Sequence, residues 1–283
     1  MSRRRELARR MEALADIAGI MSAMKGLALM ETRILMEFLG SQRRMVAGIE
    51  TAAADFLAWH GGPAAAPAAG GVELVVLAGS EQGFCGDFNE ALLAAAGRLF
   101  GHEPVRRVLV GQRLAARSGE RTDVDLVLPG AIVADEVPAV LLRLTRELGT
   151  LLAREEPAAR GLSVLYHCDA TREIRLRRLL PLGALPRDGN GGRSHAAELN
   201  LAPDVFLSAL TRHYLQAVLN EVLYSSLMAE NRKRQAHMDR ALQRLDEEQE
   251  RLRLAYNTRR QEEITEEIEV ILLSAEMMGL AGQ

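Results

Sequence analysis

The stretch "MDRALQRLDEEQERLRLAY", residues 238–256, decides the fold of the C-terminal third of the chain. Its seam positions step alternately by four and three residues: Met238, Leu242, Leu245, Gln249, Leu252 and Tyr256. This spacing is typical of a coiled-coil seam, and charged residues crowd the other faces. The seam resumes after a gap at Ile264, Ile268, Ile271 and Ala275. We therefore predict an unbroken helix from Pro203 to about Met278, roughly 110 Å long at 1.5 Å per residue.

A second long helix is predicted at the N-terminus, over residues 1–58, where no proline interrupts the pattern. Its apolar side recurs at helical spacing: Leu7, Met11, Leu14, Ile17, Met21, Met24, Ala28, Leu35, Leu39, Gln42, Met45, Ile49 and Phe56. Such a helix would be roughly 85 Å long, more than a compact domain needs. Because each long helix has an apolar stripe to bury, the two must pair with each other or project into a partner.

Between the two helices the apolar period becomes that of strands. After the helix stop "HGGPAAAPAAGG", five short runs look like strands: 72–79, 105–111, 126–130, 162–168 and 174–182. Helical segments are predicted between several of them, at about 89–100, 112–118 and 136–156. Strands that alternate with helices indicate a small α/β domain with a largely parallel sheet.

The predicted organisation therefore has four parts. They are an N-terminal coiled-coil helix (1–58), a linker (59–71), an α/β domain (72–202) and a C-terminal coiled-coil helix (203–283). Only 4% of the residues are aromatic although 48% are hydrophobic, which suits helices with cores of Ala, Leu, Val and Met.

Composition also excludes some classes of function. The net charge of −3 argues against nucleic acid or an anionic membrane surface as the main partner. No apolar stretch approaches the roughly 20 residues that span a bilayer, so we expect a soluble protein. The two cysteines, Cys85 and Cys168, have no metal or disulfide spacing and fit a reducing compartment. The six histidines are scattered, and we expect no metal site and no cofactor.

One turn could carry chemistry. The segment "VVLAGSEQGFCGDFN", residues 75–89, places Gly79, Ser80, Gly83, Cys85, Gly86 and Asn89 between a strand and a helix. This could be a phosphate cradle, or a cysteine nucleophile at a helix start. Its spacing matches neither GxxxxGK[ST] nor GxGxxG, and a tight structural turn is the simpler interpretation. An enzyme that uses Cys85 or Ser80 and dimerises through its terminal helices remains the alternative function.

Two polar sites on the long helices have two interpretations each. Lys25 lies in the apolar run "MSAMKGLALM" (21–30), and Lys233 is the only other lysine among 35 basic residues. Lys25 either snorkels beside a helix core or presents a compact ammonium to a partner. In "YNTRRQEEITEEIEVI" (256–271), Gln261 and Thr265 share one helix face, which is either solvated or meets a partner.

At these residues the chain resembles the γ subunit of F-type ATP synthases, the central rotor shaft, over nearly its whole length. "RRMEALADIAGIMSAMKGLA" (9–28) follows a family pattern in which two basic residues, Arg9 and Arg10, precede an Ile and then Ala-Met-Lys. "AGSEQGFCGDFN" (78–89) is similar to the family turn, with Gly83, Cys85, Gly86 and Asn89. "YNTRRQEEITEEI" (256–268) is similar to the family's Tyr-Asn, Arg-Gln, Ile-Thr and Glu-Ile pairs.

The resemblance implies an antiparallel coiled coil of the terminal helices plus a Rossmann-like α/β domain. It implies a non-catalytic rotor that couples ion flow to ATP chemistry at the β subunits. The expected partners are the α and β subunits of the ATPase ring, the ε subunit and the membrane c-ring, with no nucleic acid and no direct small-molecule substrate. The expected location is peripheral, on the cytoplasmic face of the bacterial plasma membrane.

The resemblance also implies a set of partner-interface residues: Arg9, Arg10, Met24, Lys25, Arg260, Gln261, Thr265 and Glu267. Lys25 would pass acidic loops of the β subunits and exchange carboxylate partners as the shaft turns. Where the family usually has Thr-Gln-Lys before its N-terminal Ile, this chain has Ile17, Ala18 and Gly19. Such departures suggest a side branch such as the second-operon N-type ATPase. A plain coiled-coil scaffold, the third candidate function, would leave the α/β domain unexplained.

Overall fold

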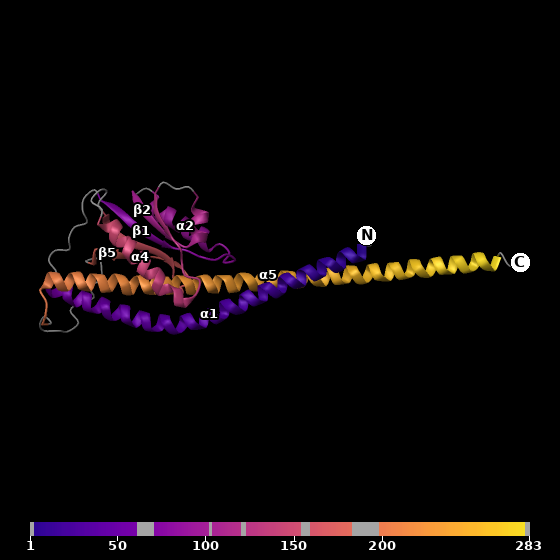
Figure 1. The fold of residues 1–283 in the computed structure, drawn as a ribbon, viewed down its shortest axis with the longest axis horizontal. Coiled ribbons are helices and arrows are strands. Elements are labelled where there is room, and N and C mark those ends of the chain that lie inside the picture. The colour runs from indigo at the N-terminus through magenta and orange to yellow at the C-terminus, as the bar shows by residue number, and fades with distance from the viewer. Residues whose placement is uncertain are drawn as a thin grey trace. The chain divides into compact units, whose positions relative to one another are not determined.

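The computed structural model describes residues 3–60, 71–101, 104–119, 123–153, 159–182 and 198–280, with side chains described up to residue 275. Most of the predicted linker, residues 61–70, lies outside the described part. Two long helices, α1 (Arg3–His60) and α5 (Pro203–Leu280), flank an α/β segment in the sequence (Figure 1). The predicted combination of two terminal helices with a central α/β fold is confirmed.

The α/β segment contains one five-stranded sheet. Its strands are β1 (Val72–Ala78), β2 (Val105–Val110), β3 (Val124–Leu128), β4 (Ala159–His167) and β5 (Ile174–Leu180). They are ordered β3-β2-β1-β4-β5, and every neighbouring pair is parallel except β4 with β5. β5 returns directly from β4 through a short turn, which permits only antiparallel pairing. The expected largely parallel sheet is confirmed.

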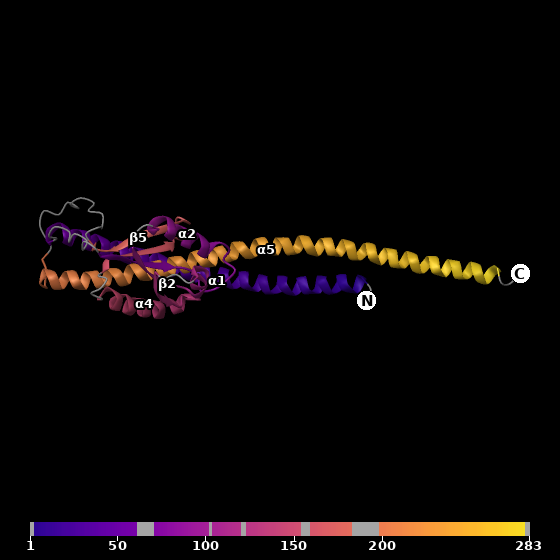
Figure 2. The same ribbon diagram turned by 90° about the horizontal axis from the view of Figure 1, so that it is seen from above.

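Helices cover both faces of this sheet. They are α2 (Phe88–Phe100), α3 (Gln112–Ser118), the short 3₁₀ helix η1 (Ala134–Glu136) and α4 (Val137–Leu152). On one face Val75 and Leu77 pack with α2 and α3. On the other, Leu74 and Val76 share a core with α4 and with residues of α1 and α5. Figure 2 shows α2 and α4 on opposite sides of the strands.

The chain divides into two compact units. Unit 1 combines Met1–Leu27 with Ala236–Gln283, and unit 2 comprises Ala28–Gln235. Unit 1 is an antiparallel helix pair. Arg4 Nε lies 3.3 Å from Glu263 Oε2, and Lys25 Nζ lies 2.5 Å from Asp239 Oδ1. Residue numbers therefore rise along α1 as they fall along α5.

The seam of unit 1 follows the prediction as far as Tyr256. Met238 and Leu252 are buried, and the seam positions between them are partly buried. The continuation at Ile264, Ile268, Ile271 and Ala275 does not pair with the described part of α1, because these side chains are exposed. The described part of α1 begins at Arg3, and Arg4 already lies beside Glu263, so α5 has no described α1 residue opposite it from Ile264 onward.

Two seam positions of α1 also differ from the prediction. Ile17 and Met45 are 45% and 44% exposed, while the next residues, Ala18 and Val46, face inward. A helix with 3.6 residues per turn allows a step of three or four at each turn, and sequence alone does not choose between them. In unit 2 the choice falls on Val46 because that side chain enters the core shared with the sheet.

One part of α1 is more apolar than the sequence analysis expected. An 18-residue window with at most two charged residues has a mean hydropathy of 1.4, and 6% of it is buried. By length and composition alone this helix could cross a membrane, so the expectation that no stretch approaches that composition was wrong. The prediction was based on uninterrupted apolar runs. An 18-residue window that contains one or two charged residues can still have a high mean hydropathy.

Candidate functional site

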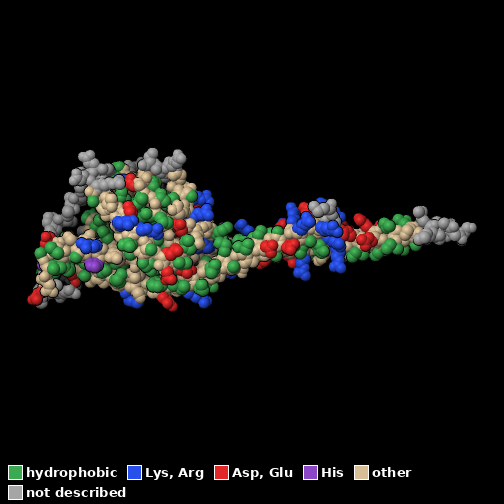
Figure 3. Space-filling model, viewed as in Figure 1, with side chains coloured by type: hydrophobic (Ala, Val, Ile, Leu, Met, Phe, Trp, Pro, Cys, Tyr) green, Lys and Arg blue, Asp and Glu red, His purple; other side chains and the backbone are tan. Residues whose placement is uncertain are grey.

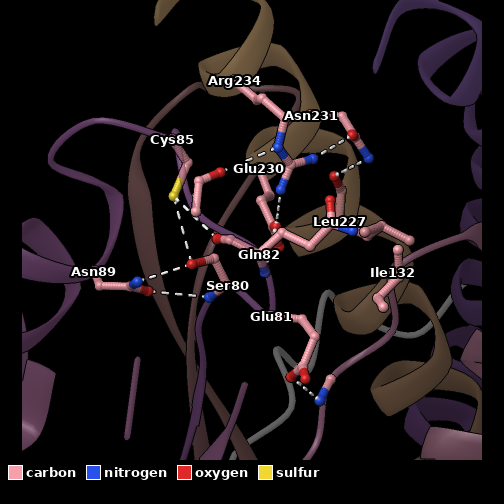
Figure 4. Close-up of polar contacts among 12 residues, drawn as sticks. Ser80, Glu81, Gln82, Cys85, Asn89, Ile132, Leu227, Glu230, Asn231 and Arg234 are labelled. Carbon is pink, nitrogen blue, oxygen red and sulfur yellow. Dashed lines mark hydrogen bonds and ion pairs between the residues drawn. The ribbon is translucent and has the colours of Figure 1, made fainter. Parts of the chain in front are cut away.

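The turn after β1 is held by its own polar side chains. The Ser80 backbone N–H donates to Asn89 Oδ1 (3.0 Å), and Asn89 Nδ2 donates to Ser80 Oγ (2.8 Å; Figure 4). Cys85 Sγ donates to the same Ser80 hydroxyl at 3.4 Å. Gly86 has a φ of 65°, where residues other than glycine are strained. The predicted motif residues Cys85, Gly86 and Asn89 therefore shape one tight strand-to-helix turn.

The cysteine of this turn is not prepared for nucleophilic chemistry. Burial raises the pKa of Cys85, which favours the thiol over the reactive thiolate. His167 ends β4 nearby, but its ring stacks on Phe88 at 3.8 Å and its Nε2 lies 2.8 Å from the Phe88 carbonyl oxygen. Burial also lowers the pKa of His167. Among the described residues, no group of three His, Cys, Asp or Glu side chains could hold a metal ion.

The turn is clamped to α5 by a buried ion pair. Glu230 pairs with Arg234, one helical turn away, and both side chains are at most 5% exposed. Glu230 Oε1 also accepts from the Gln82 backbone N–H at 3.3 Å. Arg234 Nε donates to the Gly83 carbonyl oxygen (3.2 Å), and its Nη1 donates to Asn231 Oδ1 (2.7 Å). Figure 4 shows these groups converging between the turn and the helix.

Burial and the neighbouring Arg234 charge have opposite effects on the pKa of Glu230. Burial raises the pKa of Glu230 to about 7, although the nearby Arg234 charge and hydrogen bonds oppose this rise. A carboxyl with almost no access to water keeps its charge only through its partners. At the rim of the clamp, Lys233 Nζ lies 3.1 Å from Asp87 Oδ1 and lowers the pKa of Asp87.

In doubly wound sheets, ligands bind outside the carboxyl ends of the strands, where the strand order reverses. Here the order reverses between β1 and β4. Side chains of α5 reach both strand ends. Ser226 Oγ donates to the Ala78 carbonyl oxygen (3.0 Å), and Ser225 Oγ donates to Asp169 Oδ1 (2.9 Å). Side chains of α5 therefore bond to both strand ends at the place where such sheets bind ligands.

The predicted interface residues of the long helices lie apart from this clamp in the sequence, all within unit 1. The Lys25 ammonium pairs with Asp239, a residue that the sequence analysis did not single out. Met24 is partly buried, while Arg9 and Arg10 are exposed. The C-terminal group, Arg260, Gln261, Thr265 and Glu267, is exposed as well. The Thr265 hydroxyl donates to the main-chain carbonyl oxygen of Gln261 at 2.9 Å.

Comparison with known proteins shows which family this chain belongs to. The chain is 28% identical over 222 residues to the ATP synthase gamma chain of Caldanaerobacter subterraneus subsp. tengcongensis, a match that covers 69% of this chain and 70% of that one. The family model described as ATP synthase matches residues 3–278. The chain belongs to the ATP synthase γ-chain family. Its function is that of the γ subunit, the central-stalk rotor.

Solved structures agree on the fold of this γ chain. A chain of the Euglena gracilis mitochondrial ATP synthase rotor superimposes with a TM-score of 0.64 at 14% identity, covering 92% of this chain and 98% of that one. A chain of the Tetrahymena thermophila mitochondrial ATP synthase central stalk and c-ring gives a TM-score of 0.56 at 15% identity, covering 78% and 99%.

Sequence reasoning missed the residues of α5 that clamp the turn of this γ chain. Glu230 and Arg234 were absent from every predicted set, although the sequence contains a signal for them. They continue the buried stripe formed by Leu223 and Leu227 toward Met238, at steps of three and four. An oppositely charged pair on a stripe that otherwise buries apolar side chains indicates a buried polar contact.

Proposed function

We propose that this γ chain is a non-catalytic rotor shaft that couples ion flow across the membrane to ATP synthesis or hydrolysis at the β subunits. Unit 1 would turn inside a ring of α and β subunits, and the α/β domain would face the membrane c-ring. Each orientation of the shaft would favour a different conformation of the neighbouring β subunit. Rotation would then drive the nucleotide sites in sequence without a catalytic group on this chain.

The main support for this proposal is the exposed apolar end of α5. Ile264, Ile268 and Ile271 are between 44% and 64% exposed, and Val270, Leu272 and Leu273 are exposed to a similar extent. Figure 3 shows green hydrophobic side chains gathered toward the described end of this helix, beyond a stretch dominated by charge. An apolar helix end is costly in water and is typical of a segment that other proteins enclose.

Six of the eight predicted interface side chains are exposed, which supports a more specific set of contacts. We place Arg9, Arg10, Met24 and Lys25 on the partner interface, together with Arg260, Gln261, Thr265 and Glu267. Lys25 would leave Asp239 for a β-subunit carboxylate during part of each turn and then return. An ammonium exchanges partners more readily than a guanidinium, which holds one carboxylate through two bonds.

The alternative function, an α/β enzyme built around Cys85, has less support. Ser225 and Ser226 of α5 bond to groups at the carboxyl ends of β4 and β1, and burial favours the protonated thiol of Cys85.

The membrane side of the proposal concerns the ε subunit and the c-ring. Solved rotors with this fold include one described together with its c-ring, and we extend that arrangement to this chain. We place the assembled complex peripherally on the cytoplasmic face of the bacterial plasma membrane.

Reconstitution tests the proposal. The purified chain should hydrolyse no ATP by itself, and it should co-purify with α and β subunits expressed from the same source. The assembled complex should hydrolyse ATP and, in membrane vesicles that contain the c-ring, pump ions. Nucleotide turnover by the isolated chain that disappears in Cys85→Ala would instead favour the enzyme.

A further inference from the structure

A second polar network joins three parts of unit 2, and the sequence motifs do not include it. We call it the charge ladder. It contains six side chains of alternating sign: Glu50, Arg177, Glu221, Arg43, Asp169 and Arg232. Glu50 and Arg43 lie on α1, Glu221 and Arg232 lie on α5, and the other two belong to β5 and the β4–β5 turn.

Each inner member of the ladder bridges different elements. Arg177 donates from Nη2 to Glu50 Oε1 (2.7 Å) and from Nη1 to Glu221 Oε2 (2.8 Å). Glu221 also lies 3.8 Å from Arg43 Nε. Arg177 of β5 therefore contacts both α1 and α5, and Glu221 of α5 contacts both β5 and α1.

The end of the ladder at the β4–β5 turn is held most tightly. Arg43 Nη2 donates to Asp169 Oδ1, which also accepts from Ser225 Oγ. The Asp169 backbone N–H lies 3.1 Å from the same Ser225 hydroxyl, and its carbonyl oxygen accepts from Arg232 Nη1 at 3.0 Å. Asp169 is 7% exposed, so these bonds are largely shielded from water.

Arg177, which joins Glu50 to Glu221, remains charged in the folded chain. Burial alone would lower the pKa of Arg177, but its hydrogen bonds with Glu221 and Glu50 raise that pKa above its ordinary value. Three arginines face three carboxylates, so the six formal charges cancel.

A rotor under load needs contacts that keep its sheet from sliding along α1 and α5, and charged groups can supply them. The apolar core between the sheet and the two helices resists separation, but the hydrophobic effect is non-directional. Hydrogen bonds to charged groups have fixed directions and lengths. Stability alone would not select such groups, because packed apolar residues often stabilise a buried site as well as a salt bridge does.

We infer that the charge ladder is the torque junction of the rotor, where Glu221 and Asp169 fix the sheet to both shaft helices against twisting. This inference rests on the proposed function, because it assumes that the α/β domain and the shaft turn under load. Its positioning residues are Glu221, which links Arg177 to Arg43, and Asp169, which links Arg43 to α5.

The test compares pumping with and without load. Glu221→Gln removes the central charge of the ladder and keeps the side-chain shape. It is placed in the assembled complex in membrane vesicles, and both ATP hydrolysis and the ion gradient at steady state are measured. Without a gradient, hydrolysis should equal that of the unmodified complex. Against a growing gradient, the variant should stop pumping at a smaller final gradient because the domain slips relative to the shaft.

Two controls separate torque from stability. Glu90→Gln removes an exposed ion pair with Arg117 (3.2 Å) in the same domain and should leave the final gradient unchanged. Val218→Ala loosens the core of α5 without touching a charge and should lower the melting temperature but not the final gradient. If Glu221→Gln does not fold, Arg43→Gln at the partly exposed side of the ladder takes its place, with the same expected loss.

The outcomes are distinct. A final gradient in Glu221→Gln or its substitute equal to that of the unmodified complex would overturn the inference, as would an equal loss in Val218→Ala. An unmodified chain that assembles with no α or β subunits, or pumps nothing, would instead overturn the proposed function.

Discussion

Replacing Glu230 by Gln should change how the stability of the isolated chain depends on pH. The carboxyl of Glu230 has a pKa of about 7 in the folded chain, raised by burial, against an ordinary value of 4.5. A carboxyl with a raised pKa binds its proton more tightly in the folded state than in the unfolded state. It therefore stabilises the fold fully below pH 4.5, and this contribution is lost as the pH rises to about 7.

The size of the effect follows from the difference between the two pKa values. At about 1.4 kcal/mol per pH unit, the free energy of unfolding of the unmodified chain should fall by roughly 3 kcal/mol between pH 4.5 and 7 because of this group. Gln does not titrate, so Glu230→Gln lacks that fall. The variant has its own constant offset, because the amide bonds differently to Arg234 and Gln82 than the carboxyl does, but only the change with pH matters here.

Chemical denaturation at several pH values between 4.5 and 8 measures this difference. Circular dichroism follows the helices, and the fluorescence of Trp59, the single tryptophan, follows unit 2. Glu248→Gln, in an exposed pair with Arg251, is the matched control and should track the unmodified chain. Parallel curves for Glu230→Gln and the unmodified chain would refute the reasoning, because Glu230 would then titrate as a solvated group.

Three further predictions concern the shaft and the turn. Lys25→Glu should lower the ratio of ATP-driven pumping to hydrolysis more than it lowers assembly, since it sets like charges against Asp239 and the proposed β carboxylates. The double variant Lys25→Glu with Asp239→Lys should restore the ion pair within the chain but not the pumping ratio. Gln261→Leu should reduce the ATPase rate of the complex, at roughly 1 to 3 kcal/mol for a lost buried partner, while the isolated chain melts at the same or a slightly higher temperature. The opposite pattern would assign Gln261 to the coiled coil. Cys85→Ala should leave the hydrolysis rate of the complex unchanged, and a loss of rate with normal assembly would contradict the structural role of the turn.

The sequence predicts the elements of this fold well because local patterns encode them. Alternating steps of three and four residues identify the seam from Met238 to Tyr256, and short apolar runs identify the strands. The same patterns fail where a choice depends on distant residues. Ala18 replaces Ile17 in the seam because both steps fit one helix, and the partner helix decides. Ile264 continues the heptad pattern, yet the described part of α1 begins at Arg3, and Arg4 already lies beside Glu263.

The polar sites were less predictable than the elements. The turn residues Ser80 and Asn89 are close in sequence, so a motif could reveal them. Glu230 pairs with Arg234 on the same helix, which a sequence pattern can indicate, but its bond with Gln82 forms only when α5 packs on the sheet. Asp169 likewise finds Arg43 and Ser225 only when α1 and α5 pack beside the sheet. Sequence separation of 148 residues between Gln82 and Glu230 leaves no local pattern to read.

Direct observation of rotation tests the central claim most sharply. A bead fixed to the α/β domain of this chain, in a complex whose α and β subunits are attached to a surface, reports any turning of the shaft. We predict stepwise rotation in one direction that begins when ATP is added and stops when it is exhausted. A bead that stays still while the same complexes hydrolyse ATP would show that this chain is not a rotor.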